Sequence, residues 1–167
     1  MTDSALLPDH SIRLERARLA LDGLSVGDAL GETCFLPENW NALIEDPRAT
    51  TRGPWPYTDD TTMALAIFEV LGEFGRIDQD ALARRFAARY RAAPWRGYGA
   101  GAHRLLAQIL GGTDWRVAAA AVFRGGSCGN GSAMRIAPLA AYFAEDGYEH
   151  FASAACSPVA MCDNPFL

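Results

Sequence analysis

The densest group of oxygen-bearing side chains in the sequence is the run TDDTT at 58–62. Carboxylate and hydroxyl oxygens suit Mg²⁺, which prefers octahedral oxygen coordination and keeps several waters. Neighbouring residues inside a helix point about 100° apart, so two adjacent acids converge only where a loop turns into a helix. We expect such a junction here, with Thr58 and Asp59 before the helix and Asp60 in its first turn. A purely capping role for the two acids explains the same run without a metal.

A glycine-rich segment, GNGSAMR at 129–135, is the second place where a ligand can bind. Glycines ahead of a helix start let backbone N–H groups approach a phosphate, whose charge the helix dipole favours. Arg135 adds a planar fork of donors for an anion. An interhelical loop with an exposed arginine accounts for the same residues, and the Gly-Lys-Ser/Thr of a P-loop does not follow. The segment alone leaves both interpretations open.

Other polar residues carry weaker signals. In GDALGE at 27–32, Asp28 taken alone is an ordinary helix-end residue and Glu32 an ordinary surface acid. His103 has no partner at ligand spacing, so we interpret it as structural or exposed. The cysteines show no CxxC spacing and no nearby histidine pair, which argues against zinc and favours reduced thiols. They are Cys34, Cys128, Cys156 and Cys162.

Helices are the elements expected to position these residues. Alanine is abundant and runs of Val, Ile and Thr are scarce, so we predict an all-α fold. After a loose arm at 1–10, a first helix is expected to end near GDALG at 27–31, where glycines permit unusual backbone angles. Residues 32–57 contain four prolines and no clear period, and they predict a long irregular loop.

The second half of the chain shows clearer helical periodicity, in segments that follow a polar residue and mostly stop at glycine or proline. The expected helices begin near Thr61, Asp78, Ala102, Asp114 and Ser132, and the first three end at Gly75, before Pro94 and at Gly111-Gly112. Asp78, Asp114 and Ser132 are predicted to act as N-caps. Pro138 must sit in the first turns of the last helix, because proline lacks an N–H.

Size and charge limit the classes of partner. The chain has 167 residues, half of them hydrophobic, and a formal net charge of -5. This composition suits one domain with a real core. An acidic chain without a basic block is a poor general binder of nucleic acid or of an anionic membrane. The N-terminus has no apolar core of signal-peptide length and no stretch can span a bilayer, so we expect a cytoplasmic protein.

Four segments in a fixed order make the pattern specific: GDALG, TDDTTM, GYGAGA and GNGSAMRIAP. Over residues 14–146 this order resembles the ADP-ribosylglycohydrolase family, of the dinitrogenase reductase-activating glycohydrolase type. The resemblance implies an all-α fold around a metal cleft that holds two Mg²⁺ or Mn²⁺ ions. It also implies hydrolysis of the glycosidic bond between ADP-ribose and an acceptor such as a protein side chain. The expected partner is therefore an ADP-ribose-bearing substrate, for example an ADP-ribosylated protein.

The resemblance also assigns roles by matching position. Thr58, Asp59 and Asp60 would be metal ligands, and Glu32 and Asp60 would serve the chemistry. The substrate pocket would comprise Tyr98, Gly99, Gly129, Asn130, Gly131, Ser132, Met134 and Arg135. Cleavage at the anomeric carbon passes through an oxocarbenium-like state, and metal ions can hold the ribose hydroxyls and activate a water.

Two departures from the family pattern affect these expectations. Many members carry a glutamate where this chain has Phe35, so Glu32, directly after GDALG, is the acid that can take its role. The GDTDT-like segment that completes the second metal site in the family does not occur in the sequence. We therefore expect residues 11–146 to form the N-terminal part of the family domain, 147–167 to be an atypical tail, and the metal site to be partial. Truncation or a frameshift would impair turnover, and a non-catalytic ADP-ribose-binding module or an inert fragment are the alternatives.

Overall fold

The protein is helical throughout the part that is described. The computed structural model describes residues 6–46, 54–123 and 129–146, and no strand occurs among them. The helices are α1 (His10–Thr33), α2 (Pro37–Glu45), α3 (Asp59–Phe74), α4 (Gln79–Ala92), α5 (Ala100–Leu110), α6 (Trp115–Val122), the one-turn 3₁₀ helix η1 (Ala133–Arg135) and α7 (Ala137–Tyr142). The predicted all-α fold is confirmed.

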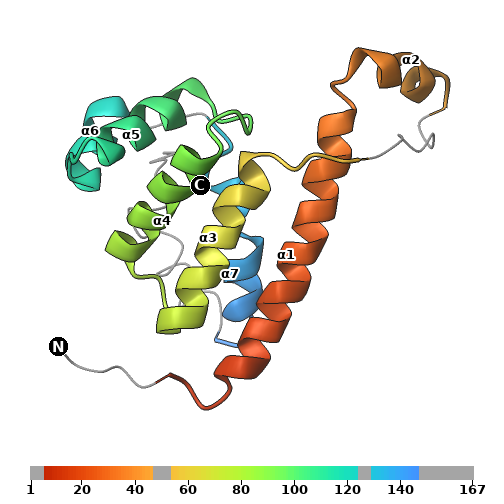
Figure 1. Ribbon diagram of the computed structural model, residues 1–167. Coiled ribbons are helices and arrows are strands. Elements are labelled where there is room, and N and C mark those ends of the chain that lie inside the picture. The colour runs from red at the N-terminus through yellow and green to blue at the C-terminus, as the bar shows by residue number, and fades with distance from the viewer. Residues whose placement is uncertain (1–5, 47–53, 124–128, 147–167) are drawn as a thin grey trace.

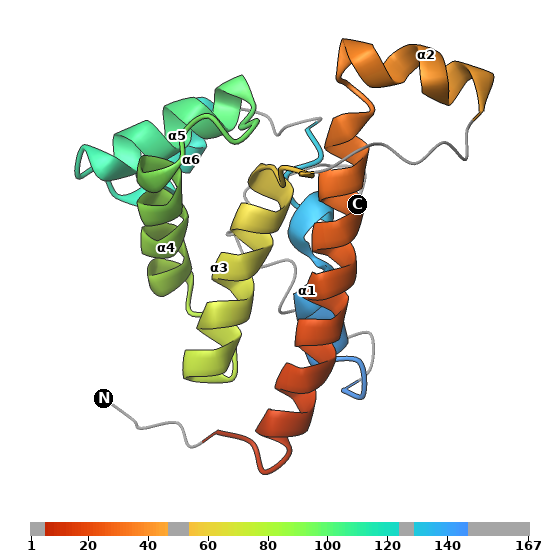
Figure 2. The same ribbon diagram turned by 45° about the vertical axis from the view of Figure 1, so that its right-hand side comes forward.

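Helix α3 is the centre of the arrangement. It lies between α1 and α4, and α7 packs against both α1 and α3 (Figure 1). Helix α5 packs on α4 and α6 packs on α5, while α2 turns away from the bundle at the C-terminal end of α1 (Figure 2). The segment that leads into α3 crosses the C-terminal half of α1 (Figure 1). This crossing brings the first turn of α3 beside the GDALGE segment.

The core forms around α3 because its apolar residues cover more than one face. Met63, Val70 and Leu71 are almost completely buried, and alanines at 64 and 66 let neighbouring helices approach closely. Gly75 ends the helix in the left-handed conformation, with φ of 64°, as the sequence predicts. Helix α3 is therefore held rigidly at the middle of the bundle, and its N-terminus has a fixed position.

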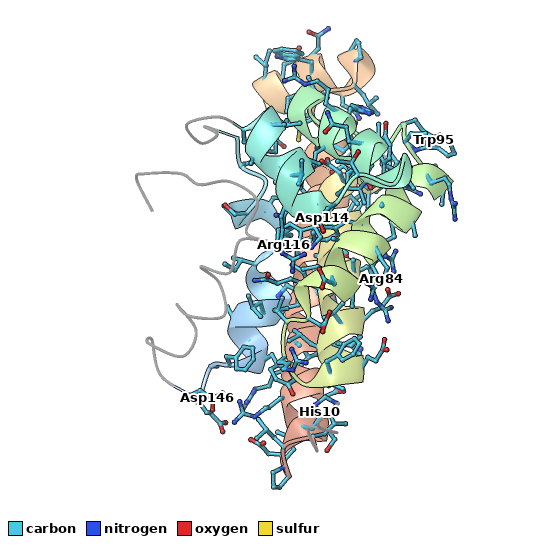
Figure 3. All side chains as sticks on the ribbon, turned by 90° about the vertical axis from the view of Figure 1, so that its left-hand side faces the viewer. His10, Arg84, Trp95, Asp114, Arg116 and Asp146 are labelled. Atoms are coloured by element: carbon cyan, nitrogen blue, oxygen red, sulfur yellow. The ribbon has the colours of Figure 1, made fainter. Side chains whose placement is uncertain are left out.

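A polar cluster joins the N-terminal end of α1 to α7 and to the residues that follow α7. The buried Arg13 donates to Asp9 at 2.8 Å and, through both terminal nitrogens, to Asp146. The His10 ring lies 2.6 Å through Nδ1 from the Tyr142 hydroxyl and 3.3 Å through Nε2 from the Gly72 carbonyl. Figure 3 shows His10 and Asp146 at this same end of the molecule. We call Asp9, His10, Arg13, Tyr142 and Asp146 the basal cluster.

The predicted end of the first helix is wrong. Helix α1 starts at His10 and continues through GDALGE to Thr33, and neither Gly27 nor Gly31 has a positive φ. Glycine lowers helix propensity by only about 1 kcal/mol, and packing of α1 against α3 and α7 outweighs that cost. As a result Asp28 and Glu32 lie one turn apart on the same helix.

Three other expectations need correction. The predicted loop at 32–57 contains α2, which begins with a proline in its first turn, where no N–H is needed. Asp59 lies inside the first turn of α3, after the N-cap Thr58. Ser132 makes no side-chain capping bond and precedes only the 3₁₀ turn, because α7 starts at Ala137 with Pro138 in its first turn.

The aspartate caps are confirmed. Asp78 accepts the N–H of Ala81 at 2.8 Å, and Asp114 accepts the N–H of Arg116 at 2.8 Å. Most of the N-terminal arm, the tail at 147–167, and three of the cysteines lie outside the described residues, whereas Cys34 is an exposed free thiol. Within the described ranges, none of the helices combines the length and the apolar character needed to cross a membrane.

Candidate functional site

A cavity of about 620 Å³ opens where α1, the start of α3, the turn before α5 and the glycine-rich segment meet. Its wall contains parts of all four motif segments that the sequence singles out. The lining residues are Leu24, Gly27, Asp28, Gly31, Glu32, Phe35, Thr58, Asp59, Asp60, Gly97, Gly99, Asn130 and Met134. We call this space the acidic cavity, because four carboxylates line it.

Helix α1 brings two acids to the acidic cavity with different surroundings. Asp28 accepts four hydrogen bonds from the start of α3: from Thr58 N at 2.8 Å, Thr58 Oγ1 at 2.6 Å, Thr61 N at 3.1 Å and Thr61 Oγ1 at 2.6 Å. Oδ2 accepts three of these bonds and Oδ1 accepts one, so both oxygens of Asp28 are engaged by the start of α3. Glu32, one turn further along, is half-buried and makes no side-chain hydrogen bond within the described part of the chain. Glu32 is thus the acid of α1 that is free to act on a ligand.

The N-terminus of α3 presents Thr58, Asp59 and Asp60 to the same space. Thr58 has extended backbone and its hydroxyl accepts the N–H of Asp60 at 3.3 Å, as an N-cap does. Asp59 and Asp60 both line the acidic cavity, so the two neighbouring carboxylates face one space and not opposite sides of the helix. The local structure that the sequence predicts for these acids, a loop-to-helix junction, places them together.

The pKa values of Asp59 and Asp60 are both raised. Burial is the main cause for Asp60, followed by the charges of Asp28 and Asp59, and together they raise its pKa to about 6. Burial also raises the pKa of Asp59, and Asp28 adds to that effect, while the charge of Arg135 opposes it. Asp60 is therefore only partly ionised in slightly acidic solution and ionised at neutral pH.

The turn before α5 also lines the acidic cavity, through Gly97 and Gly99. Gly97 has a φ of 82°, and a Cβ at this position would lie 3.4 Å from Asp59 Oδ1 and 3.5 Å from Thr58 Cβ. The Arg96 guanidinium stacks 3.8 Å from the centre of the Tyr57 ring and donates to the Tyr57 carbonyl at 2.6 Å. The contacts of Arg96 fasten the residue before Thr58 to the turn, and the positive φ is what favours glycine at position 97.

A second cavity of about 280 Å³ adjoins the first and shares Asp59, Gly99, Asn130 and Met134 with it. Gly129, Gly131 and Arg135 line this smaller space. Arg135 is buried, lies 5.0 Å from the centre of the Phe86 ring, and has Nη1 3.5 Å from Met63 Sδ. The alternative of an exposed arginine in a plain loop is therefore wrong: this cation lies inside the protein, beside the acids.

Two of the predicted site residues, Tyr98 and Ser132, line neither of the two cavities. Tyr98 is 5% exposed and belongs to the hydrophobic core. Burial raises its pKa to about 12. The remaining residues expected at the site all line one or both spaces: Glu32, Thr58, Asp59, Asp60, Gly99, Gly129, Asn130, Gly131, Met134 and Arg135.

The donor set at the start of α3 fits a hard divalent cation only in part. The Thr58 hydroxyl gives its proton to Asp28 and one lone pair to the N–H of Asp60, which leaves one lone pair open. With Asp59 and Asp60 it offers three oxygen ligands of the type that Mg²⁺ and Mn²⁺ accept. Across residues 6–46, 54–123 and 129–146, no three His, Cys, Asp or Glu side chains gather into a metal-holding group. These residues thus suit one face of an octahedral ion.

Sequence reasoning missed several residues of the acidic cavity. Leu24, Gly27 and Gly31 line it from α1, which continues without a break through GDALGE, and Gly97 lines it from the turn before α5, where its φ is positive. The spacing of four between Asp28 and Glu32 was the available signal for α1. Residues four apart are neighbours only on a continuous helix, and the glycines of the segment had predicted that the helix ends there.

A family model described as ADP-ribosylglycohydrolase matches residues 9–162, which includes part of the expected tail. The chain is 35% identical over 155 residues to ADP-ribosylhydrolase ARH3 of Danio rerio, which covers 86% of this chain and 41% of that protein. It is 41% identical over 100 residues to ARH3 of Homo sapiens, with 58% and 28% covered.

A bacterial relative shows a similar degree of likeness. ADP-ribosylarginine hydrolase Tri1 of Pseudomonas putida is 32% identical over 149 residues, which covers 82% of this chain and 38% of that protein. The chain spans less than half of the length of each of these curated relatives.

Proposed function

Because this chain belongs to the ADP-ribosylglycohydrolase family, we propose that it binds an ADP-ribose-bearing molecule and contributes to hydrolysis of the bond between the ribose and its acceptor. The observation that carries the proposal is the acidic cavity, around which all four motif segments meet. A cavity of about 620 Å³ has the size of a small-molecule site. The smaller cavity beside it extends the available space toward Arg135.

The proposed binding mode follows from charge. Glu32, Asp59 and Asp60 suit the hydroxyl groups of a ribose, which can donate to carboxylates. The diphosphate suits the other side, where the backbone of Gly129–Gly131 and the cation of Arg135 line the smaller cavity. The sugar to be cleaved would then lie beside Glu32 and Asp60, and its acceptor would point toward the open mouth.

Glu32 is our candidate for the catalytic acid or base, because it is the cavity acid of α1 without a hydrogen-bond partner in the described chain. In hydrolysis a water adds to the anomeric carbon, the bond to the acceptor breaks, and the acceptor leaves with a proton. Glu32 would take the proton of that water and pass it to the leaving acceptor, and Asp60, ionised at neutral pH, would orient the water or the ribose.

We also propose that Thr58, Asp59 and Asp60 bind Mg²⁺ or Mn²⁺. When bound, such an ion lowers the pKa of a water and stabilises developing negative charge. Three side-chain oxygens leave about half of the coordination positions to water or substrate. We therefore expect weak cation binding and slow turnover by this chain on its own.

Calorimetry with ADP-ribose, with and without Mg²⁺, tests the binding part of this proposal. Asp59→Asn should weaken Mg²⁺-dependent binding about tenfold or more, as expected when a metal ligand or its neighbour is lost. Asp22→Asn, the same change at an exposed position of α1, is the matched control and should leave binding unchanged. If the wild-type chain shows no heat of binding with either ADP-ribose or the metal, the proposal is wrong.

The hydrolytic part is tested with ADP-ribosylated arginine, the substrate in the name of the Pseudomonas relative. Product should form slowly, and Glu32→Gln should lower the rate about 100-fold while binding stays within a few-fold. Glu45→Gln, at an exposed position on α2, is the control. Binding without any product would instead make the chain an ADP-ribose-binding module.

A further inference from the structure

Asp28 has no role in the function proposed above, although it is the most extensively hydrogen-bonded acid at the site. Its four bonds all run to Thr58 and Thr61, thirty and thirty-three residues later in the chain. Oδ2 accepts three of these bonds and Oδ1 accepts the fourth, so the start of α3 engages both carboxylate oxygens. Asp28 therefore lines the acidic cavity while its carboxylate is held chiefly by α3.

Comparison with the other helix starts shows what Asp28 does instead. Helices α4 and α6 satisfy an early N–H with their own N-cap, Asp78 and Asp114 respectively. Helix α3 also uses its own N-cap, Thr58, for the N–H of Asp60, but the N–H of Thr61 is satisfied by Asp28, an acid that belongs to α1. An acid from another helix thus shares the capping of α3, while Asp59 and Asp60 line the cavity.

The same carboxylate also sets the direction of the Thr58 hydroxyl. Asp28 Oδ1 accepts its only proton at 2.6 Å, and the N–H of Asp60 uses one of its lone pairs. The hydroxyl oxygen is then fixed with its remaining lone pair available. Without Asp28 the hydroxyl can rotate, and its proton can point into the cavity in place of its lone pair.

We propose that Asp28 is the positioning residue of this site: from α1 it holds the hydroxyls and amides of Thr58 and Thr61, and so turns the Thr58 oxygen, Asp59 and Asp60 toward the acidic cavity. This inference rests on the proposed function only for the nature of what the cavity binds. The positioning itself is a property of the chain without any ligand.

Hydrogen exchange of the wild-type chain provides the first test. The N–H groups of Thr58 and Thr61 precede the first backbone bond of α3, which runs from Thr62 N to Thr58 O. Asp28 is the acceptor of both, so slow exchange at these two amides requires it. We expect NMR to show that both amides exchange more than tenfold more slowly than in an unstructured chain. Exchange at the rate of an unstructured chain would overturn the proposal.

Asp28→Asn provides the second test because the amide has the same shape and only one accepting oxygen. The NH₂ group of the new side chain would face the hydrogen-bond donors of α3. The backbone amides of Thr58 and Thr61 should therefore exchange at least tenfold faster, while the amides of α4 exchange as in wild type. Thr61→Val removes one hydroxyl from Asp28 and leaves Thr58 in place. Mn²⁺ affinity, measured by the electron paramagnetic resonance signal of the free ion, should fall at least tenfold in Asp28→Asn and stay within about threefold in Thr61→Val.

The outcomes separate the two proposals. If the wild-type chain does not bind Mn²⁺, the metal site is wrong, and the exchange of Thr58 and Thr61 still decides the role of Asp28. Asp28→Asn could instead lower thermal stability while the exchange rates of the two amides and the Mn²⁺ affinity of the folded protein stay as in wild type. In that case Asp28 is merely structural and the proposal is wrong. Should Asp28→Asn not fold, the wild-type exchange pattern carries the test.

Discussion

Two carboxylates on one helix, Asp28 and Glu32, differ in function because they differ in partners. The first accepts four hydrogen bonds and organises α3, whereas the second accepts none within the described chain and faces the cavity. Composition and spacing do not distinguish them, since both are acids of the same motif. At the scale of the residue, the number of hydrogen bonds that an acid accepts separates a structural acid from one that can act on a ligand.

The raised pKa of Asp60 predicts a pH dependence of stability. Its pKa is about 6 in the folded protein and lies near the ordinary value of about 4 in the unfolded chain, so the native state binds more protons between these values. The free energy of unfolding should therefore fall as the pH rises from 4 to 6. Asp60→Asn removes this loss and should be more stable than wild type at pH 7 by about 1 kcal/mol, after allowance for solvent screening.

Urea unfolding with EDTA at several pH values measures this difference. The difference in the free energy of unfolding between Asp60→Asn and wild type should be small at pH 4 and constant above pH 7. Asp22→Asn, whose carboxylate is exposed, should show no such trend. A gap that narrows with increasing pH would contradict the assignment of Asp60 as a destabilised acid.

At the scale of the element, helix α1 supplies five of the thirteen residues that line the cavity, and two of the five are glycines. A Cβ at Gly23, Gly27 or Gly31 would meet nothing within 4 Å. Gly27 and Gly31 line the acidic cavity, and Gly23 does not. Glycine in a helix interior is unfavourable, so at Gly27 and Gly31 stability and access to the cavity are opposed.

Gly27→Gln and Gly23→Gln test this opposition as a matched pair. Both should raise the free energy of unfolding by about 0.5–1 kcal/mol, because glutamine is a better helix former than glycine. Only Gly27→Gln places a side chain at the acidic cavity, so it should weaken ADP-ribose binding at least tenfold, whereas Gly23→Gln leaves it unchanged. Thermal unfolding and calorimetry measure the two effects, and equal binding by both variants would show that the ligand lies elsewhere.

Local sequence signals predicted most of the elements but not how they meet. The caps Asp78 and Asp114 and the stop at Gly75 are confirmed, because short-range chemistry alone determines each of them. The predicted end of α1 is wrong, because packing against α3 and α7 outweighs the low helix propensity of two glycines. The role of Asp28 could not be predicted, since it depends on a contact between segments thirty residues apart.

At the scale of the whole molecule, the basal cluster and the acidic cavity lie at opposite ends of α1. Arg13 is buried, and its pKa is raised above the ordinary value chiefly by its hydrogen bonds to Asp146. Together with His10 and Tyr142, it joins the first described helix to the last one. The position of α1, and with it that of Asp28 and Glu32, depends on this remote contact.

Replacing the buried arginine should therefore lower stability without touching the site. Arg13→Met keeps the apolar stem but loses the bonds to Asp9 and Asp146, and it should lower the free energy of unfolding by about 2 kcal/mol. The loss is moderate because water can still reach the two acids that are left without their partner. Arg18→Met, which removes exposed pairs to Glu15 and Asp22, is the control and should cost about 0.5 kcal/mol or less. Urea unfolding compares the two, and equal losses would mean that the basal cluster adds nothing to the fold.

The charge around the acidic cavity has a consequence for the kinetics of association. Four carboxylates and no basic side chain line it among the described residues, and the whole chain carries a formal net charge of -5. An approaching diphosphate is therefore repelled at long range, before it makes any contact. Added salt screens that repulsion over about 10 Å at 0.1 M, so the encounter rate should increase with ionic strength, opposite to the trend for nucleotides that approach a basic pocket.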